Sequence, residues 1–156
     1  MAITHTPSST TTRHRTGTAA VSEQLHDPAY QAFWLLRIGF TAAPILFGLD
    51  KYFHVLVNWD RYFAPDVVSA TPWSAHQLMY VVGAIEVVAG LVVLLKPKWG
   101  AYLVAAWLAG IIINLLLIPG FYDVALRDFG LFIAALALAR LATAFDGSTT
   151  RSIPRA

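Results

Sequence analysis

The stretch from Leu78 to Leu95, LMYVVGAIEVVAGLVVLL, decides the fold of this chain, because it is long and apolar enough to cross a lipid bilayer as a helix. Glu86 is the one charged residue that interrupts it. A carboxylate at the centre of a bilayer costs about 2.5–3.5 kcal/mol on insertion scales. A chain that keeps Glu86 at this depth must pair it, protonate it or use it. The residue is therefore the first candidate for a functional site.

The composition of the whole chain is that of a membrane protein. Of its 156 residues, 57% are hydrophobic and 13% are charged, whereas soluble domains carry roughly 25% charge. The chain has no cysteine, which excludes disulfides, thiol chemistry, iron–sulfur clusters and covalently attached haem. The net charge is only +2 and the sequence has no dense basic patch, so we expect no nucleic-acid partner.

Three further segments are apolar over a similar length, which makes four candidate membrane spans. A spanning helix needs about 20 mainly apolar residues. Pro97 and Gly100 mark the link after the second span, and Pro119 and Gly120 mark the next one. Because links this short force consecutive helices to run antiparallel, we predict an all-α transmembrane four-helix antiparallel bundle. The spans are expected at about residues 32–55, 75–95, 100–118 and 124–145.

The two ends of the chain differ in composition from the spans. Residues 1–29 are rich in Thr, Ser, Arg and His, and residues 147–156 are also polar. Because such segments cannot bury a core, we predict a disordered N-terminal tail and a flexible C-terminal tail. The membrane domain is expected between them, at residues 30–146. We expect no secretory signal, since no apolar h-region follows the first basic residues at the usual distance.

Basic residues near the ends of the spans predict the orientation of the bundle. Lys96, Lys98 and Arg140 lie on the same side as both chain ends, and the positive-inside rule places that side in the cytoplasm. We therefore predict a multi-pass protein of the cytoplasmic membrane with both termini in the cytoplasm. The one sizeable outer link, residues 56–74, contains the aromatic stretch 58–65, which we interpret as either a short interfacial helix or a plain loop.

Small and charged residues form a stripe along each of the first two spans. A helix with about 3.6 residues per turn brings the members of each stripe to one side. We expect the two stripes to face each other across an antiparallel pair. Arg37 lies on the cytoplasmic side of Glu86, so its long side chain either reaches Glu86 or extends to the membrane interface. The stripes are Arg37, Pro44, Gly48 and Lys51 on the first span, and Met79, Gly83, Glu86 and Gly90 on the second.

Several spans place polar groups at one depth, on the outer side of Glu86. With a rise of about 1.5 Å per residue, these groups lie roughly 7–11 Å from the bilayer centre. One interpretation is a polar pocket that opens outward. The other is a set of ion pairs, such as Lys51–Asp128 and Asp50–Arg127, that only fix helix register. The groups at this depth are Asp50, Lys51, Asn114, Arg127 and Asp128, and together with Glu86 and Arg37 they form the candidate intramembrane polar cluster.

Two histidines, His54 and His76, lie at the outer ends of the first two spans, where an antiparallel pair brings them close together. Paired imidazoles can bind haem or a metal ion, or hydrogen-bond a quinone carbonyl, and they can equally be ordinary interface residues. We predict no metal site, because two histidines without further ligands do not usually hold zinc or haem. No cofactor is evident from any motif, so a quinone is the one candidate ligand.

Four short segments of the membrane domain resemble sequence motifs of one known family. They are Leu35–Gly39, Phe47–Phe53, Gly83–Glu86 and Arg127–Asp128. In these segments the chain resembles the DoxX family of small bacterial and archaeal membrane proteins, over about residues 30–146. The resemblance implies a four-helix membrane bundle. It also implies a loose association with redox chemistry, since the family takes its name from a subunit of a thiosulfate:quinone oxidoreductase.

Three functional hypotheses remain open from the sequence. The first is an accessory or anchor subunit of a quinone-linked redox system, in contact with the lipid bilayer and with redox-enzyme subunits or further copies of itself. The second is a small transporter or ligand-binding bundle that uses Glu86 as a proton or substrate site. The third is a purely structural membrane protein. A self-sufficient enzyme ranks last, because the sequence has no nucleophile–base pair, metal motif or phosphate loop.

Overall fold

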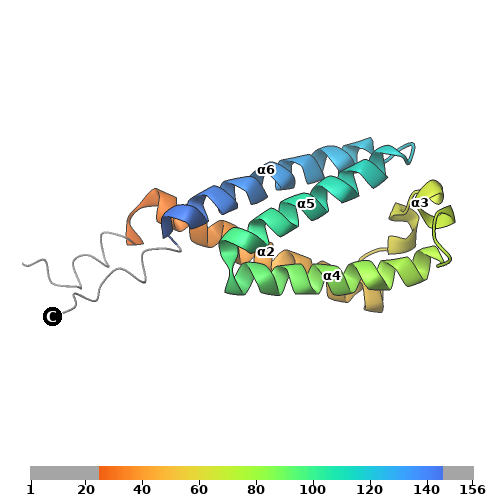
Figure 1. The fold of residues 1–156 in the computed structure, drawn as a ribbon, viewed down its shortest axis with the longest axis horizontal. Coiled ribbons are helices and arrows are strands. Elements are labelled where there is room, and N and C mark those ends of the chain that lie inside the picture. Colours follow the sequence, from red (N-terminus) through yellow and green to blue (C-terminus); the bar gives the residue numbers. More distant parts are fainter. Residues whose placement is uncertain (1–24, 146–156) are drawn as a thin grey trace, which may run out of the picture.

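The computed structural model describes residues 25–145, and all regular structure in that range is helical. The long helices run up and down in turn and form an antiparallel bundle (Figure 1). The fold class predicted from the sequence is therefore confirmed. The long helices are α2 (Pro28–Phe53), α4 (Ala75–Leu95), α5 (Pro97–Leu116) and α6 (Tyr122–Phe145).

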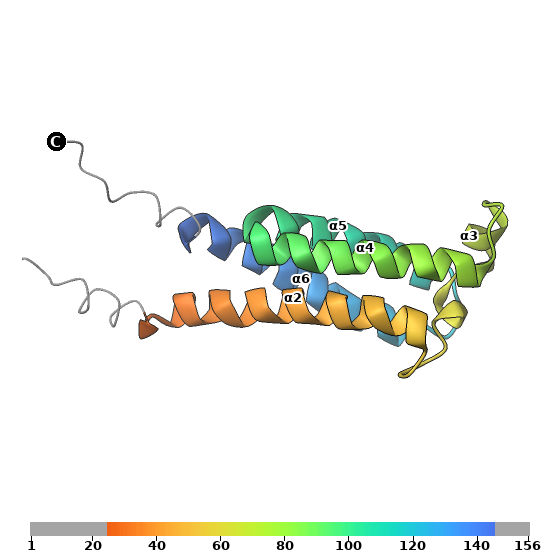
Figure 2. The ribbon, with the colours of Figure 1, turned by 90° about the horizontal axis from the view of Figure 1, so that it is seen from below.

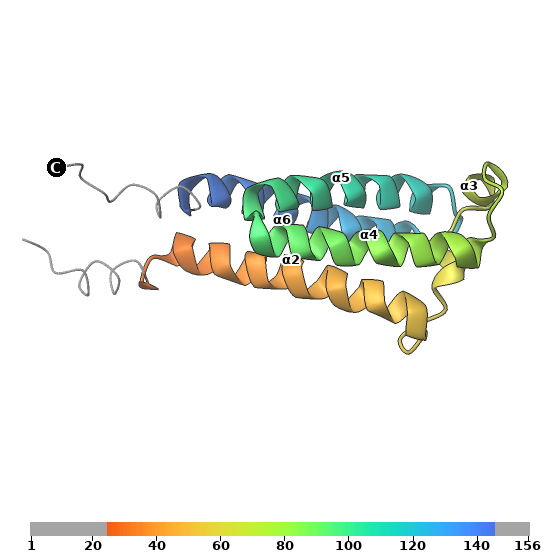
Figure 3. The same cartoon turned by 60° about the horizontal axis from the view of Figure 1, so that its bottom comes forward.

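The bundle consists of two helix pairs, α2 with α4 and α5 with α6, and α4 also packs against α5 (Figures 2 and 3). Both ends of the described chain lie at one end of the bundle, with the α4–α5 link; we call this the terminal end (Figure 1). The turn between α5 and α6 lies at the other end, which we call the loop end. Two short helices, η1 (Trp59–Tyr62) and α3 (Pro65–Ser69), also lie there.

Local sequence signals set where the helices begin. The Asp27 side chain accepts a hydrogen bond from a backbone N–H of the first turn of α2, and Ser74 and Gln77 form a reciprocal capping box at the start of α4. Pro97 takes the first position of α5, where a helix needs no N–H donor. The link between α4 and α5 is therefore Lys96 alone, and α5 begins three residues before the span expected from about residue 100.

The first helix also differs from its predicted bounds. It begins at Pro28 because Asp27 caps it there, and it ends at Phe53 because His54 adopts a left-handed backbone conformation with φ of 54°. Pro44 lies inside α2 without ending it. The tails predicted at residues 1–29 and 147–156 lie outside the described residues, except for residues 25–29.

Four helices in the described part of the chain are long and apolar enough to cross a membrane, which supports a multi-pass membrane protein. Their outward faces carry large apolar side chains. Leu35, Leu95 and Leu126, for example, are 73%, 73% and 71% exposed. A soluble protein rarely leaves so much apolar surface in water, whereas lipid tails solvate it at no cost.

The apolar core fills the half of the bundle nearer the terminal end. Aromatic rings of α2, such as Phe33, meet branched and small side chains of the other three helices. Val93 and Leu138 are completely buried, and so are several alanines of α5 and α6. Small residues at these contacts let the helix backbones approach closely, as in other membrane bundles.

Two glycines, Gly48 and Gly83, allow α2 and α4 to approach closely in the other half of the bundle. A Cβ atom added to Gly48 would lie 2.6 Å from the carbonyl oxygen of Gly83, and one added to Gly83 would lie 2.7 Å from that of Gly48. The atoms in the way are backbone, so relief would require moving a whole helix. This contact joins the two predicted stripes and confirms that they face each other.

We predict that Gly83→Ala destabilises the bundle by about 1–3 kcal/mol, the usual effect of overpacking a close contact. Gly39→Ala is the matched control, since Gly39 also lies on a long helix and nothing stands within 4 Å of an added Cβ. The control should keep or slightly raise stability, because alanine favours the helix. Thermal unfolding in detergent, followed by circular dichroism, compares the two. Equal midpoints would contradict the close approach of α2 and α4.

Candidate functional site

A buried ion pair joins α2 to α4 in the half of the bundle near the loop end. The Nζ atom of Lys51 donates to Oε2 of Glu86 at 2.6 Å, and the two residues are only 4% and 9% exposed. Each lies three residues beyond a glycine of the close helix contact, Gly48 or Gly83. The close backbones therefore bring the two side chains within reach. The ion pair also explains how the chain keeps a carboxylate inside an apolar span, because the lysine compensates its charge.

Three further side chains surround this ion pair. The Trp59 ring of η1 lies over Lys51, with Nζ 4.0 Å from the ring centroid, which adds a cation–π contact. Trp107 of α5 brings its buried indole N–H near Glu86, yet this N–H has no hydrogen-bond partner within residues 25–145. Asp128 of α6 is half-buried and acts on Glu86 electrostatically. Glu86 thus lies in the field of one lysine and of a second carboxylate.

Asp50, the residue before Lys51, holds the outer link in place. Its carboxylate accepts hydrogen bonds from the backbone N–H groups of Val55 and Leu56, at 3.0 and 3.1 Å. It also accepts the indole N–H of Trp59 at 2.6 Å. These bonds turn the chain back at the end of α2. They also fix Trp59 above the ion pair.

Asn114 of α5 holds the second part of the outer link. Its Oδ1 accepts the backbone N–H of Ala64 at 3.0 Å, and its Nδ2 donates to the carbonyl of Tyr62 at 2.6 Å. The amide thus binds both a donor and an acceptor of irregular backbone. The stretch 58–65, interpreted from the sequence as a short interfacial helix or a plain loop, contains the short helix η1 and ends at the first residue of α3.

The two arginines of the predicted cluster lie away from Glu86. Arg37 donates from Nη2 to the backbone carbonyl of Leu94 at 2.6 Å, near the terminal end. That carbonyl belongs to the last turn of α4, where helices leave carbonyls without partners. Arg127 forms an exposed ion pair with Asp123, one turn earlier on α6, at 2.6 Å. Contact with Glu86, one of the two outcomes considered for Arg37, is therefore wrong, and the side chain instead ends at the last turn of α4.

The two ion pairs considered from the sequence do not form within residues 25–145. Lys51 bonds to Glu86 instead of Asp128, and Asp50 bonds to backbone and to a tryptophan instead of Arg127. Equal depth along the bundle does not decide which groups meet, because each helix also has a rotation. Successive residues differ by about 100° around a helix, so groups at one depth can face different neighbours.

A second group of polar rings lies at the loop end of α2 and α4. His54 and His76 stack with ring centroids 5.3 Å apart and 16° between their planes, so the predicted proximity is confirmed. Nδ1 of His76 lies 3.1 Å from Oδ2 of Asp60, and its Nε2 lies 2.9 Å from the Tyr80 hydroxyl. Tyr80 in turn stacks on Tyr52, with centroids 5.0 Å apart.

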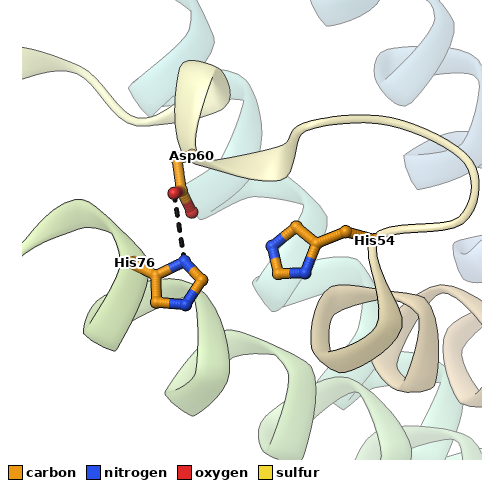
Figure 4. Close-up of side chains that lie close together, drawn as sticks. All are labelled: His54, Asp60 and His76. Atoms are coloured by element: carbon orange, nitrogen blue, oxygen red, sulfur yellow. Dashed lines mark hydrogen bonds and ion pairs between the residues drawn. The ribbon is translucent and has the colours of Figure 1, made fainter.

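His54, Asp60 and His76 converge from three separate elements (Figure 4). His54 directly follows α2, Asp60 belongs to η1 and His76 lies in the first turn of α4. One possible metal-ligand atom of each residue lies within 4.8 Å of those of the other two. Oδ1 of Asp60 is buried and has no hydrogen-bond partner in the described residues. Two imidazoles and a carboxylate are donors that divalent transition metals accept.

Three residues at these sites were not identified from the sequence, namely Trp59, Asp60 and Trp107. Trp107 lies in the middle of a span, where an indole N–H finds no partner in lipid, and this was a usable signal of an interior polar neighbour. Trp59 and Asp60 lie in the outer link. Their positions depend on how that link folds over the bundle, which no local pattern reports.

Comparisons of the chain with protein-family models, with curated proteins and with solved structures give no match. The resemblance of short segments to the DoxX family therefore stays an expectation. Function is inferred below from the geometry of the ion pair and of the polar rings at the loop end.

We predict that removing one partner of the Lys51–Glu86 pair destabilises the bundle by about 3–5 kcal/mol, because the other charge stays buried. Glu86→Gln and Lys51→Met test the partners separately, and the double variant should recover much of the loss. The exposed Arg127–Asp123 pair is the matched control, with an expected coupling of about 0.3–0.5 kcal/mol. Denaturation of all variants in detergent yields both coupling energies. Similar couplings for the two pairs would show that burial does not decide the strength of the first.

Proposed function

We propose that this protein is an accessory membrane subunit that anchors or assists a quinone-linked redox system. The observation that carries the proposal is that the polar residues of the predicted cluster, Asp128 excepted, are bound by other groups of the bundle. Lys51 and Glu86 pair, Arg37 binds a backbone carbonyl, and Asp50 and Asn114 hold the outer link. Groups bound in this way maintain a fixed shape. They are not presented to a substrate as a nucleophile, an acid or a base would be.

The outward surface supports contact with a partner in the membrane. Phe53 and Val55 lie at the end of α2 and beyond it, and they are 73% and 79% exposed. Exposed apolar side chains at a helix end, beside a link held rigidly by Asp50, form a defined surface for another protein. Transmembrane helices associate through such packing, because lipid gives no hydrophobic drive of its own.

The redox part of the proposal depends on the resemblance to the DoxX family and on the rings at the loop end. Tyr52, Tyr80 and His76 offer flat faces, and His54 stacks beside them. A quinone head group is also flat and carries two carbonyl acceptors. Aromatic stacking together with an imidazole donor would hold such a head group at the membrane surface.

We predict that the full-length chain, extracted from its native membrane in mild detergent, is recovered together with subunits of a membrane redox enzyme. Affinity purification and mass spectrometry make the measurement. A Val55→Asp variant should lose these subunits, because a charge in the apolar surface opposes docking. Leu126→Asp is the matched control, since Leu126 is similarly exposed but lies on α6. Recovery of the wild-type chain alone, or with copies of itself only, would overturn the proposal.

A proton-binding bundle is a second candidate function, because Asp128 brings a second carboxylate near the buried Glu86. Lys51 neutralises Glu86, whereas Asp128 makes no hydrogen bond or ion pair with any residue from 25 to 145. The cation that acts on Asp128 is its neighbour Arg127, which already forms an ion pair with Asp123. An unpaired charge inside a membrane is costly, and binding a proton or another cation removes it.

If the bundle moves protons, liposomes that contain the wild-type chain should dissipate an imposed pH gradient. Asp128→Asn and Glu86→Gln should then slow the dissipation to the rate of protein-free liposomes. Asp123→Asn is the matched control, since it removes an exposed carboxylate from the same helix. A pH-sensitive dye inside the liposomes reports the rate. A wild-type rate in the Asp128→Asn variant would exclude this function.

A further inference from the structure

We propose that His54, Asp60 and His76 bind one divalent transition-metal ion at the loop end, and that Zn²⁺ fits the site best. The proposal goes beyond the accessory role and does not depend on it. It adds a ligand to the two histidines for which the sequence predicted no metal. Asp60 supplies that ligand from a different element, so the site exists only in the folded chain.

The donor set matches a zinc site that is open to solvent or to a further ligand. Two imidazole nitrogens and one carboxylate oxygen are a common set of three protein ligands for zinc, with water in the fourth position. Imidazole favours zinc, copper, iron and nickel, whereas magnesium and calcium prefer oxygen donors alone. The class of ion therefore follows from the two histidines.

The distances need little change to accept the ion. With zinc bonds of about 2.0–2.1 Å, two ligand atoms in a tetrahedral site lie roughly 3.3 Å apart. Nδ1 of His76 and Oδ2 of Asp60 are already 3.1 Å apart. The donor atom of His54 lies within 4.8 Å of both, so it must move by at most about 1.5 Å toward each to reach the same spacing. Figure 4 shows the His54 ring facing the other two residues.

Two hydrogen-bonding features point to an ion independently of the spacing. Oδ1 of Asp60 is buried without a partner in the described part of the chain, and such an acceptor is costly unless something binds it. A metal ion, or the water bound to it, would satisfy this oxygen. The other feature is the Tyr80 hydroxyl, 2.9 Å from Nε2 of His76. Metal-binding histidines almost always have their second nitrogen held in this way, which fixes the ring.

The location gives the ion a structural consequence. His54 ends α2, Asp60 belongs to η1 and His76 lies in the first turn of α4, so one ion would join three elements. A quinone carbonyl at the loop end would meet the same imidazole nitrogens. The two occupants would therefore compete for the site, and a metal-binding measurement distinguishes them.

We predict that the full chain, stripped of metal by a chelator in detergent, binds one Zn²⁺ per chain in isothermal titration calorimetry. Asp60→Asn, His54→Asn and His76→Gln should each weaken binding at least about tenfold, since even residues that only support ligands have effects of that size. Asparagine suits position 54 because it tolerates left-handed backbone. His26→Gln is the matched control, as His26 is exposed and lies before α2.

Two results of the titration would overturn the proposal. Wild-type affinity in all three ligand variants would place any bound zinc elsewhere, and absence of binding by the wild-type chain would exclude the site. Circular dichroism melting of each variant identifies a weakened affinity that follows only from unfolding. Cobalt absorption provides a second measurement, because Co²⁺ at the site should give the strong visible bands of low coordination, and Asp60→Asn should lose them.

Discussion

The Lys51–Glu86 ion pair is the interaction on which the rest of the structure depends. Two charges in a low-dielectric interior hold each other strongly only at short range and in one orientation. The pair therefore sets both the depth and the rotation of α2 against α4. Gly48 and Gly83 make the short distance possible, because any side chain at either position would push the helices apart. The ion pair and the glycine contact thus act together to fix how α2 packs against α4.

Polar groups collect on one half of the bundle, and this division determines how the outer link is built. The half near the terminal end is filled by apolar side chains such as Phe33 and Leu138. The other half holds the ion pair and the side chains that bind irregular backbone. Such backbone must find hydrogen-bond partners near a membrane, where water is scarce. Asp50 and Asn114 provide these hydrogen-bond partners from inside the spans. The link is therefore held by the polar residues that interrupt the otherwise apolar helices.

The sequence predicted features that depend on one helix at a time, and it failed where a feature depends on how elements meet. Hydropathy located the spans, and helical periodicity located the stripes that contain Lys51 and Glu86. The partner of Arg37 was not predictable, because a long flexible side chain reaches many acceptors and a backbone carbonyl leaves no mark in the sequence. Asp60 was missed for a related reason. Its approach to His76 requires the whole link to fold back over the bundle.

A single turn of η1 connects the loop-end rings to the buried ion pair. Trp59 lies over Lys51 and donates to Asp50, while the next residue, Asp60, lies beside His76. Any ligand that holds Asp60 therefore also restricts the tryptophan above the lysine. A bound metal ion would hold Trp59 in place over the ion pair, and loss of the metal ion would make Trp59 more mobile. Water that reached Lys51 and Glu86 would weaken their attraction. A metal ion bound by His54, Asp60 and His76 would therefore strengthen the buried ion pair by keeping water away from it.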